Sequence, residues 1–253
     1  RGKFEATLDE IAATTTPVDS GKYEGIEFDL ATSDIGHKRV SEGAQFSKIV
    51  GKTKEKAINI VKIGRRIEAT YEALSRVRAN VLAVTFQAIG VQIGRDLVSE
   101  AIYTLINGDG NSNAASDVGI ASAGTLAYAD MLKLELSFDE GFESRLLIAD
   151  KATMTKIMSL AEFKDALVAN EWLKNGMPQT PFGNKLRINS GVSADVILAL
   201  DPSSALELLE ERGGSLVETD KIIDKQIENT VIAKRLGFNK LFTGASKLLD
   251  ISP

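Results

Sequence analysis

Two short motifs resemble ligand-binding loops, and each lacks a residue that its chemistry requires. Gly51-Lys52-Thr53 could end a phosphate-binding loop, but that motif needs a glycine five residues earlier, where this chain has Phe46. Asp109 begins a run like a calcium loop, but Ala114 replaces the glycine of the turn and Ile120 replaces the bidentate glutamate. The sequence therefore predicts neither a phosphate site nor a calcium site.

Other reactive groups are sparse. His37 is the only histidine and cysteine is absent, which excludes histidine-pair and thiolate metal sites as well as disulfides. No GxSxG motif accompanies His37, and adjacent acidic pairs such as Glu210 and Glu211 are typical of solvated faces. We therefore expect no catalytic residue, no cofactor, no metal and no enzyme activity. A soluble α+β hydrolase is a remote alternative, which would need a pocket with converging titratable groups.

Composition narrows the class further. The chain of 253 residues is 43% hydrophobic, enough for one large or two modest folded domains, and its net charge of −5 disfavours a nucleic-acid-binding surface. Residues 81–98 are almost continuously apolar, but four polar residues interrupt them, so we expect a buried helix of a soluble protein and no membrane contact. The chain begins at Arg1, which is compatible with a processed or trimmed product made in a cytosol.

The elements that carry these residues begin with a large extension. Residues 1–20 read as an irregular arm, whereas apolar alternation over 22–30 and again over 56–67 predicts two strands around a polar middle. Strand arms of about fifteen residues would reach roughly 50 Å, about the width of a domain of this mass. Such a hairpin has no core of its own, so we expect it to project and to bury itself on another copy of the protein.

A long helix follows the extension. Thr70 can cap a short first turn, and residues 79–106 carry apolar side chains at roughly helical spacing, which predicts a helix of about 42 Å. Gly90 and Gly94 lie one turn apart, which suits either a close backbone approach or two glycines tolerated in a buried helix. We expect burial along much of this helix.

The remaining residues predict an α+β domain. We expect helices at 126–138, 153–160, 161–169 and 203–211, and strands at 145–149, 186–189 and 196–200. Residues 216–242 are strand-like and are expected to pair with the strand at 56–67, which would close the first domain around an inserted second one.

Charge is distributed unevenly. Residues 38–56 contain six bases and two acids, whereas residues 207–228 contain seven acids and three bases. A basic hairpin and an acidic body suit a head-to-tail contact between copies, which closes into rings, although two separately solvated faces would give the same pattern. The candidate inter-subunit contact residues are Lys38, Arg39, Lys48, Lys52, Lys54, Lys56, Glu207, Glu218, Asp220 and Glu228.

The order of several short runs resembles the major capsid proteins of tailed bacteriophages with the Hong Kong 97-type fold. These runs are Lys62-Ile-Gly-Arg-Arg-Ile-Glu68, Thr70-Tyr-Glu-Ala-Leu-Ser75, Gln87-Ala-Ile-Gly90, Leu105-Ile-Asn-Gly-Asp-Gly-Asn111, Phe182-Gly183, Leu198-Ala-Leu-Asp-Pro202 and Val217-Glu-Thr-Asp220. The resemblance covers nearly the whole chain, and the ordered set is more specific than any one motif.

The resemblance implies an α+β capsid fold with four parts. Residues 1–21 would be an N-terminal arm, 22–65 the extended β-hairpin loop, 66–111 with 216–253 the peripheral domain and its spine helix, and 112–215 the axial domain. It further implies hexamers and pentamers in an icosahedral head that encloses double-stranded DNA without sequence-specific binding. The expected partners are other copies, a portal, and a scaffold or maturation protease, with assembly in the host cytoplasm and a final place in the virion.

Two points stay open under this resemblance. Some members join subunits through a Lys–Asn isopeptide bond, for which Lys48 or Lys52 could supply the amine and Asn229 or Asn239 the amide, although no local pattern specifies them. The alternative within the same fold is the shell of an encapsulin-type nanocompartment, which encloses a cargo enzyme instead of a genome.

Overall fold

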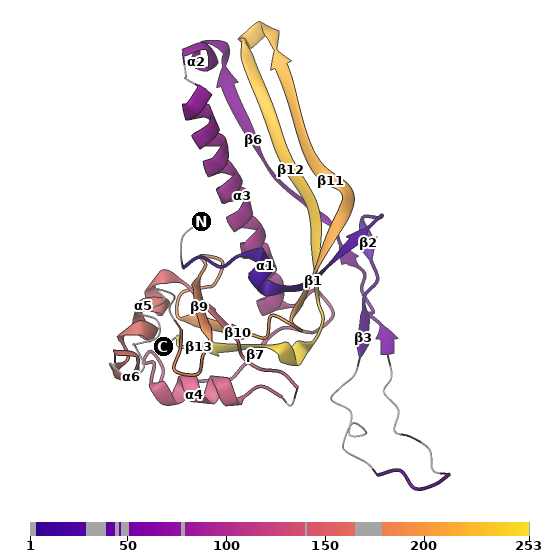
Figure 1. Ribbon diagram of the computed structural model, residues 1–253, viewed down its shortest axis with the longest axis vertical. Coiled ribbons are helices and arrows are strands. Elements are labelled where there is room, and N and C mark those ends of the chain that lie inside the picture. The colour runs from indigo at the N-terminus through magenta and orange to yellow at the C-terminus, as the bar shows by residue number, and fades with distance from the viewer. Residues whose placement is uncertain are drawn as a thin grey trace.

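The computed structural model describes residues 4–28, 39–43, 46, 51–76, 79–139, 141–164 and 179–252. Its long axis is formed by one helix and three long strands, with a smaller helix-flanked sheet at one end and a hairpin at the side (Figure 1). The helices are α1 (Leu8–Ile11), α2 (Tyr71–Arg76), α3 (Ala79–Asn107), α4 (Tyr128–Leu136), α5 (Lys151–Ser159) and α6 (Ala161–Lys164), with 3-10 turns at Ile223–Lys225 and Thr243–Ala245. The strands are β1 (Ala12–Val18), β2 (Lys22–Tyr23), β3 (Ile26–Phe28), β4 (Gly51–Thr53), β5 (Ile58–Asn59), β6 (Val61–Thr70), β7 (Ser116–Asp117), β8 (Leu146–Ala149), β9 (Lys185–Ile188), β10 (Val196–Leu200), β11 (Leu206–Ile222), β12 (Ile227–Lys240) and β13 (Ser246–Asp250).

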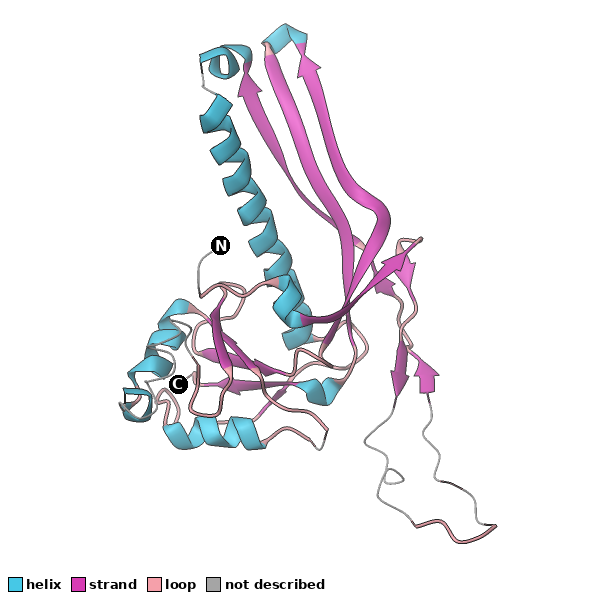
Figure 2. Cartoon of the chain, viewed as in Figure 1, coloured by secondary structure: helices cyan, strands magenta, loops and turns pink. Residues whose placement is uncertain are grey.

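The long part of the molecule is a four-stranded sheet in the order β1-β11-β12-β6, with α3 running alongside it (Figure 2). β12 pairs antiparallel with the whole length of β6, from Ile227 opposite Thr70 to Leu236 opposite Val61, which confirms the predicted return of the chain. The hydroxyl of Thr70 accepts a hydrogen bond from the Ala73 N–H at 3.2 Å, so the predicted cap of α2 is also confirmed.

The helix predicted over residues 203–211 is wrong, because these residues enter β11. Asp201-Pro202 resembles the start of a helix, and the Ser203 N–H does donate to Asp201 Oδ1 at 3.0 Å, as in a helix cap. No helix follows this contact. Leu206 and Leu208 instead pack into the core while the backbone pairs with β1 and β12. Gly213, at φ 70°, lies where the register between β11 and β12 shifts. The pair Gly213-Gly214, which in sequence resembles the end of a helix, therefore marks a β-bulge.

The N-terminal arm is more ordered than its sequence suggests. It forms α1 and then β1, which pairs parallel with β11 at the edge of the long sheet. Arg187 of β9 donates two hydrogen bonds to the Glu10 carboxylate, at 2.8 and 2.9 Å, and Arg95 of α3 pairs with Glu5. The arm is therefore held to both sheets and to α3.

The smaller part is a five-stranded sheet in the order β7-β13-β10-β8-β9. β8 alternates between two cores: Leu146 and Ile148 face the carboxyl-terminal half of α3, while Leu147 and Ala149 face α4 and α5. The predicted strands at 145–149, 186–189 and 196–200 correspond to β8, β9 and β10, and the predicted helices at 126–138 and 153–160 to α4 and α5. Of the helix predicted at 161–169, residues 161–164 form α6 and the others lie outside the described residues.

Strand pairing places two boundaries differently from the expected four-part division. β13 lies in the five-stranded sheet, although residues 216–253 were expected to belong with the spine helix. β6 starts at Val61 in the long sheet, so the described hairpin consists of β2 with β5 and β3 with β4 and ends before residue 65. In Figure 1, β3 lies at the side of the molecule, apart from both larger sheets, as expected for a projecting arm.

Candidate assembly surfaces

The amino-terminal half of α3 is an unpartnered apolar surface. Val81, Val84 and Phe86 are exposed, with Val84 at 65%, whereas the buried part of α3 begins at Ile93 and continues through Leu97, which is 9% exposed. The expectation of burial along much of this helix is therefore wrong within one subunit. The physical reason is that the smaller sheet lies only at the carboxyl-terminal end of the helix, where the α3 residues from Ile93 to Leu105 pack into the core (Figure 1).

Other exposed apolar side chains lie on different elements from this helix surface. Val217 and Ile223 lie at the end of the β11–β12 hairpin, and Ile26, Val40 and Phe46 belong to the extended loop. Exposed apolar patches of this kind mark interaction sites in soluble proteins. Their spread over both ends of an elongated subunit indicates contacts with more than one neighbour.

A groove runs beside α3 where its two glycines face outward. It is bounded by Gly90, Val91 and Gly94 on the helix and by residues 5–9 of the N-terminal arm. A side chain added at either glycine would meet no heavy atom within 4 Å, so these glycines are not explained by packing inside the subunit. They leave room for an external backbone or side chain.

The predicted charge contacts are only partly accessible. Arg39, Lys52 and Lys56 are exposed on the loop, Glu218 and Asp220 are exposed near the β11–β12 turn, and Lys38 and Lys48 lie outside the described residues. Glu228 is half-buried and lies 3.8 Å from Lys221 of its own chain. Part of the acidic segment is thus neutralised internally, which leaves apolar burial as the larger source of affinity.

Two predicted contact residues, Lys54 and Glu207, are less accessible than expected. Both are buried within their own chain, Lys54 with 1% of its side chain exposed, because they belong to a polar cluster at the base of the hairpin. As placed in the single subunit, they are poorly exposed for contact with a neighbour. The sequence shows no local pattern that separates these two charges from the solvated ones around them.

The polar cluster contains Lys54, Asp109, Glu207, Asn239 and Lys240. Lys54 Nζ donates to Asp109 Oδ2 at 2.5 Å, to Asn239 Oδ1 at 2.7 Å and to the Lys240 carbonyl oxygen at 2.6 Å. Asn239 Nδ2 donates to Glu207 Oε2 at 2.6 Å, and Lys240 Nζ donates to the Leu105 carbonyl oxygen at 3.0 Å. The cluster therefore joins the hairpin, the end of α3 and both long strands β11 and β12.

Burial governs the protonation of this cluster. It lowers the pKa of Lys240 to about 8, an effect that the nearby Asp109 opposes and the charges of Lys54 and Lys247 reinforce. Burial would raise the pKa of Asp109, but hydrogen bonds from Lys54, Asn111 and Asn113 outweigh it and hold that pKa below its usual value. Asp109, the first residue of the run that resembles a calcium loop, thus binds the ammonium group of Lys54.

The two amides considered for a cross-link are both internal. Asn229 accepts a hydrogen bond from Arg66 at 3.3 Å, and Asn239 belongs to the polar cluster. Of the two proposed lysines, Lys52 is exposed in β4 and Lys48 lies outside the described residues. The amine beside Asn239 is that of Lys54, a residue that was assigned only to charge contacts.

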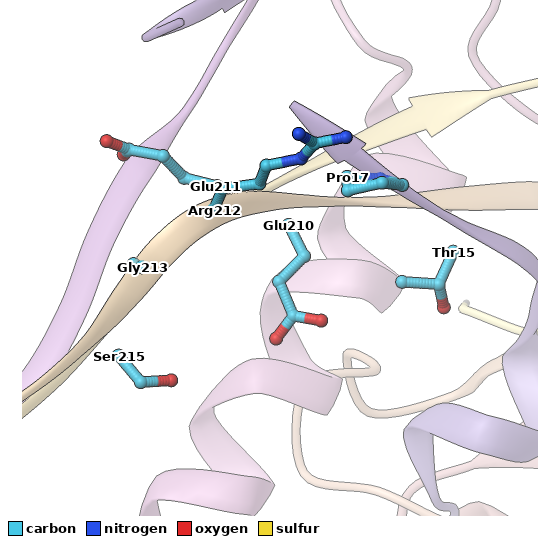
Figure 3. Close-up of a pocket in the computed structure, with 8 residues that line it drawn as sticks. Thr15, Pro17, Glu210, Glu211, Arg212, Gly213 and Ser215 are labelled. Atoms are coloured by element: carbon cyan, nitrogen blue, oxygen red, sulfur yellow. The ribbon is translucent and has the colours of Figure 1, made fainter. Parts of the chain in front are cut away.

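The described residues show no enzyme-like site. Gly51-Lys52-Thr53 forms β4 and pairs with β3, so it is not a loop between a strand and a helix, and His37 lies outside the described residues. A hollow at the β11 bulge is lined by Thr15, Pro17 and residues 210–215, and Glu210 and Glu211 point to opposite faces of the strand there (Figure 3). Each of these two carboxylates is ion-paired, Glu210 with Lys234 and Glu211 with Arg235.

Among the described residues, no group of three or more His, Cys, Asp or Glu side chains could hold a metal ion. Within those residues, no helix is both long and apolar enough to cross a membrane.

Comparisons with known structures agree on this fold. The chain matches the capsid of a native GTA particle with a TM-score of 0.70 and 16% identity, over 100% of this chain and 91% of that one. It matches Gordonia phage Cozz with a TM-score of 0.68 and 10% identity, over 99% of this chain and 88% of that one. The SrpI encapsulin complex of Synechococcus elongatus PCC 7942 matches with a TM-score of 0.60 and 14% identity, over 95% and 85%. These likenesses establish the Hong Kong 97-type fold.

Sequence comparison identifies the family. No curated protein sequence matches the chain. The family model described as phage capsid protein, however, matches residues 53–238, which include α3, all strands of the smaller sheet except β13, and β6, β11 and nearly all of β12 in the long sheet. The chain therefore belongs to the phage capsid protein family, a family of structural, non-enzymatic proteins of the virion.

Proposed function

We propose that the chain forms the hexamers and pentamers of an icosahedral head that encloses double-stranded DNA. The observation that supports this most is the exposed apolar half of α3, which a soluble monomer would have no reason to leave uncovered. Family membership makes the chain a self-assembling shell subunit, and the elongated shape offers contacts at both ends.

The proposed contact between neighbours is heterologous. The hairpin of one copy, with Ile26 and exposed Lys52, would lie on the long sheet and α3 of the next, near Val84 and the acidic β11–β12 end. A contact of different surfaces on the two partners closes into rings when its rotation allows, which suits rings of five and six. Apolar burial would supply affinity, while charge sets the register and rate of association.

The four-part division of the chain is part of this proposal, with its boundaries adjusted to strand pairing. The extended loop would end before β6, and β13 would join the axial domain around residues 112–205. A portal and a scaffold or maturation protease would act with the shell, because a ring-forming subunit alone does not fix head size. The acidic chain, at net charge −5, would enclose DNA without binding its sequence.

Negative-stain microscopy of the purified chain tests the assembly. We expect closed shells or rings of capsomers, and their sedimentation should slow when the protein is diluted or the salt is raised. A monodisperse monomer at high protein concentration, with no rings after removal of any expression tag, would contradict the proposal.

The second candidate, an encapsulin-type shell, is supported by the SrpI encapsulin match over 95% of the chain. It differs in what the shell encloses. Nuclease-protected double-stranded DNA inside particles from infected cells would support the phage head, whereas a single co-purified protein cargo and no nucleic acid would support the compartment.

A further inference from the structure

A polar hollow of about 480 Å³ lies where the N-terminal arm, α3 and the smaller sheet meet. Phe4 and Glu5 of the arm form one wall, α3 forms the second, and the third consists of Lys151 and the segment after β9. Strands β8 and β9 are parallel and end side by side at Ala149 and Ile188, so the hollow lies outside their carboxyl ends. Ligands commonly bind in a crevice at this position of a parallel sheet.

The amide of Asn189 presents an unused hydrogen-bond donor to this hollow. The residue is 8% exposed, and its Oδ1 accepts hydrogen bonds from the Gly191 N–H at 2.6 Å and from the Ser99 hydroxyl at 3.1 Å. A side chain at position 191 would begin 2.9 Å from Asn189 Oδ1 and from Ser99, so the glycine permits this arrangement. Because Oδ1 is held by these contacts, Nδ2 is the amide atom left for the hollow, and no described residue accepts from it. A nearly buried donor without an acceptor is rare in folded proteins.

The charges around the hollow favour a negatively charged occupant. Its two acids are already matched within the chain, Glu5 by Arg95 and Asp96 by Arg65. The ammonium group of Lys151, at the start of α5, is exposed and has no acidic partner among the described residues. Arg95 also keeps N–H groups that its bond to Glu5 does not use. The hydrogen-bonding groups that remain available are therefore donors, and two of them are cationic.

We propose that this hollow binds a small oxyanion of the phosphate class, held by Lys151, Arg95 and the amide nitrogen of Asn189. Phosphate oxygens accept several charge-assisted hydrogen bonds at once, which matches a site whose free groups are donors. The volume suits a phosphate ion or a small phosphate ester. The inference goes beyond the proposed function, because it assigns a ligand site within the subunit and not a contact between subunits.

A bound anion would join separate parts of the subunit. Arg95 belongs to α3 and is paired with the arm, Lys151 begins α5, and Asn189 follows β9. A ligand that binds only the folded chain raises its stability as the ligand concentration rises. Amide exchange of Ala6, whose N–H donates to the Ile188 carbonyl oxygen at 3.2 Å, should therefore slow in phosphate.

Calorimetric titration of the purified, assembled protein with inorganic phosphate, at an ionic strength held constant with sodium chloride, tests the inference. We expect saturable binding of one phosphate per chain and a melting temperature that rises with phosphate concentration. Lys151→Gln should weaken binding about tenfold without changing the melting temperature in chloride alone. Asn189→Asp keeps an oxygen for Gly191 and Ser99 but replaces the donor with a negative acceptor, so it should abolish binding. Lys62→Gln, which changes an exposed lysine of β6, should bind like the parent.

Two further titrations identify the ligand more closely. A nucleoside monophosphate that binds more tightly than inorganic phosphate would assign the site to a phosphate ester, whereas weaker binding would assign it to the free ion. Acetate that binds as tightly as phosphate would overturn the phosphate class. The inference would also be overturned by an absence of saturable binding up to about 10 mM phosphate, or by equal binding to the parent and Asn189→Asp. Particle formation is scored separately by microscopy, so failure of phosphate binding leaves the proposed assembly intact.

Discussion

Substituting Val84 with Asp separates the folding role of α3 from its assembly role. Val84 is 65% exposed in the subunit, so an aspartate there stays solvated, and we expect the free energy of unfolding to change by no more than about 0.5 kcal/mol. If a neighbour covers this side chain, the variant loses about 1.5–3 kcal/mol of apolar burial per contact, plus the cost of desolvating a charge. At about 1.4 kcal/mol per factor of ten, each contact weakens at least roughly tenfold, and a shell repeats that loss at every subunit.

Leu97 gives the matched position on the same helix. It is 9% exposed and packs in the core between α3 and the two sheets, so Leu97→Asp should cost several kcal/mol and unfold the chain. Urea denaturation followed by circular dichroism measures the first property, and sedimentation with negative-stain microscopy measures the second. Val84→Thr, similar in shape and uncharged, should assemble at a lower protein concentration than Val84→Asp requires, although at a higher one than the parent.

Two results would refute this reasoning about α3. A Val84→Asp chain as unstable as Leu97→Asp would mean that the amino-terminal half of the helix is part of the subunit core. Normal particles of the Val84→Asp variant, at the parent's threshold concentration, would mean that no neighbour covers this surface.

Three further predictions concern charge. Lys52→Glu with Lys56→Glu should leave the circular dichroism spectrum unchanged and slow ring formation most at low salt, whereas equal assembly rates at low and moderate salt would make these lysines merely solvated. Burial lowers the pKa of Lys240 from 10.5 to about 8, so the unfolded state binds more protons between these values. Stability should therefore rise with pH across that window in the parent and stay flatter in Lys240→Met, as measured by urea denaturation at each pH. A hydrogen bond from Arg187 holds the pKa of Glu10 below 4.5. The contribution of this contact to the stability of the arm should be complete above that pH and lost as pH falls below it. Amide exchange of β1 should then rise at acid pH in the parent and be high at all pH values in Glu10→Gln.

The sequence predicts the elements whose periodicity is local. The pairing of β6 with β12, the strands of the smaller sheet, and α4 and α5 all follow from alternating or helical spacing within about fifteen residues. The prediction of a helix over residues 203–211, which include the start of β11, follows from Asp201-Pro202 and Gly213-Gly214, because these pairs resemble helix boundaries. The strand conformation of β11 depends on partners far along the chain, namely β1 and residues 227–240, which no local pattern reveals.

The accessibility of the candidate assembly surfaces likewise depends on segments that are distant in the sequence. The buried part of α3 is set by how far the smaller sheet extends along the helix. The sequence from Val81 to Val98 is apolar almost throughout, so it does not show where the cover by that sheet ends. Lys54 and Lys52 are two residues apart in one charged segment, yet one is buried and the other exposed. Lys54 differs from Lys52 only because Asp109 and Asn239 approach it from distant segments. Counting charges along the sequence therefore finds a basic segment but does not show which of its lysines are exposed.

The burial of so many charges at the hairpin base has a consequence for how the subunit is built. A buried ion pair adds little net stability, because desolvation offsets most of its attraction, but removing one partner is strongly destabilising. Lys54 finds Asp109, Asn239 and the Lys240 carbonyl oxygen in only one register of the hairpin against the long sheet. A shift of the hairpin that moved this amine away would leave Asp109 buried without its cation. We infer that the cluster specifies the position of the extended loop more than it strengthens the fold. A loop that must reach a defined place on a neighbouring subunit requires this placement before any inter-subunit contact forms.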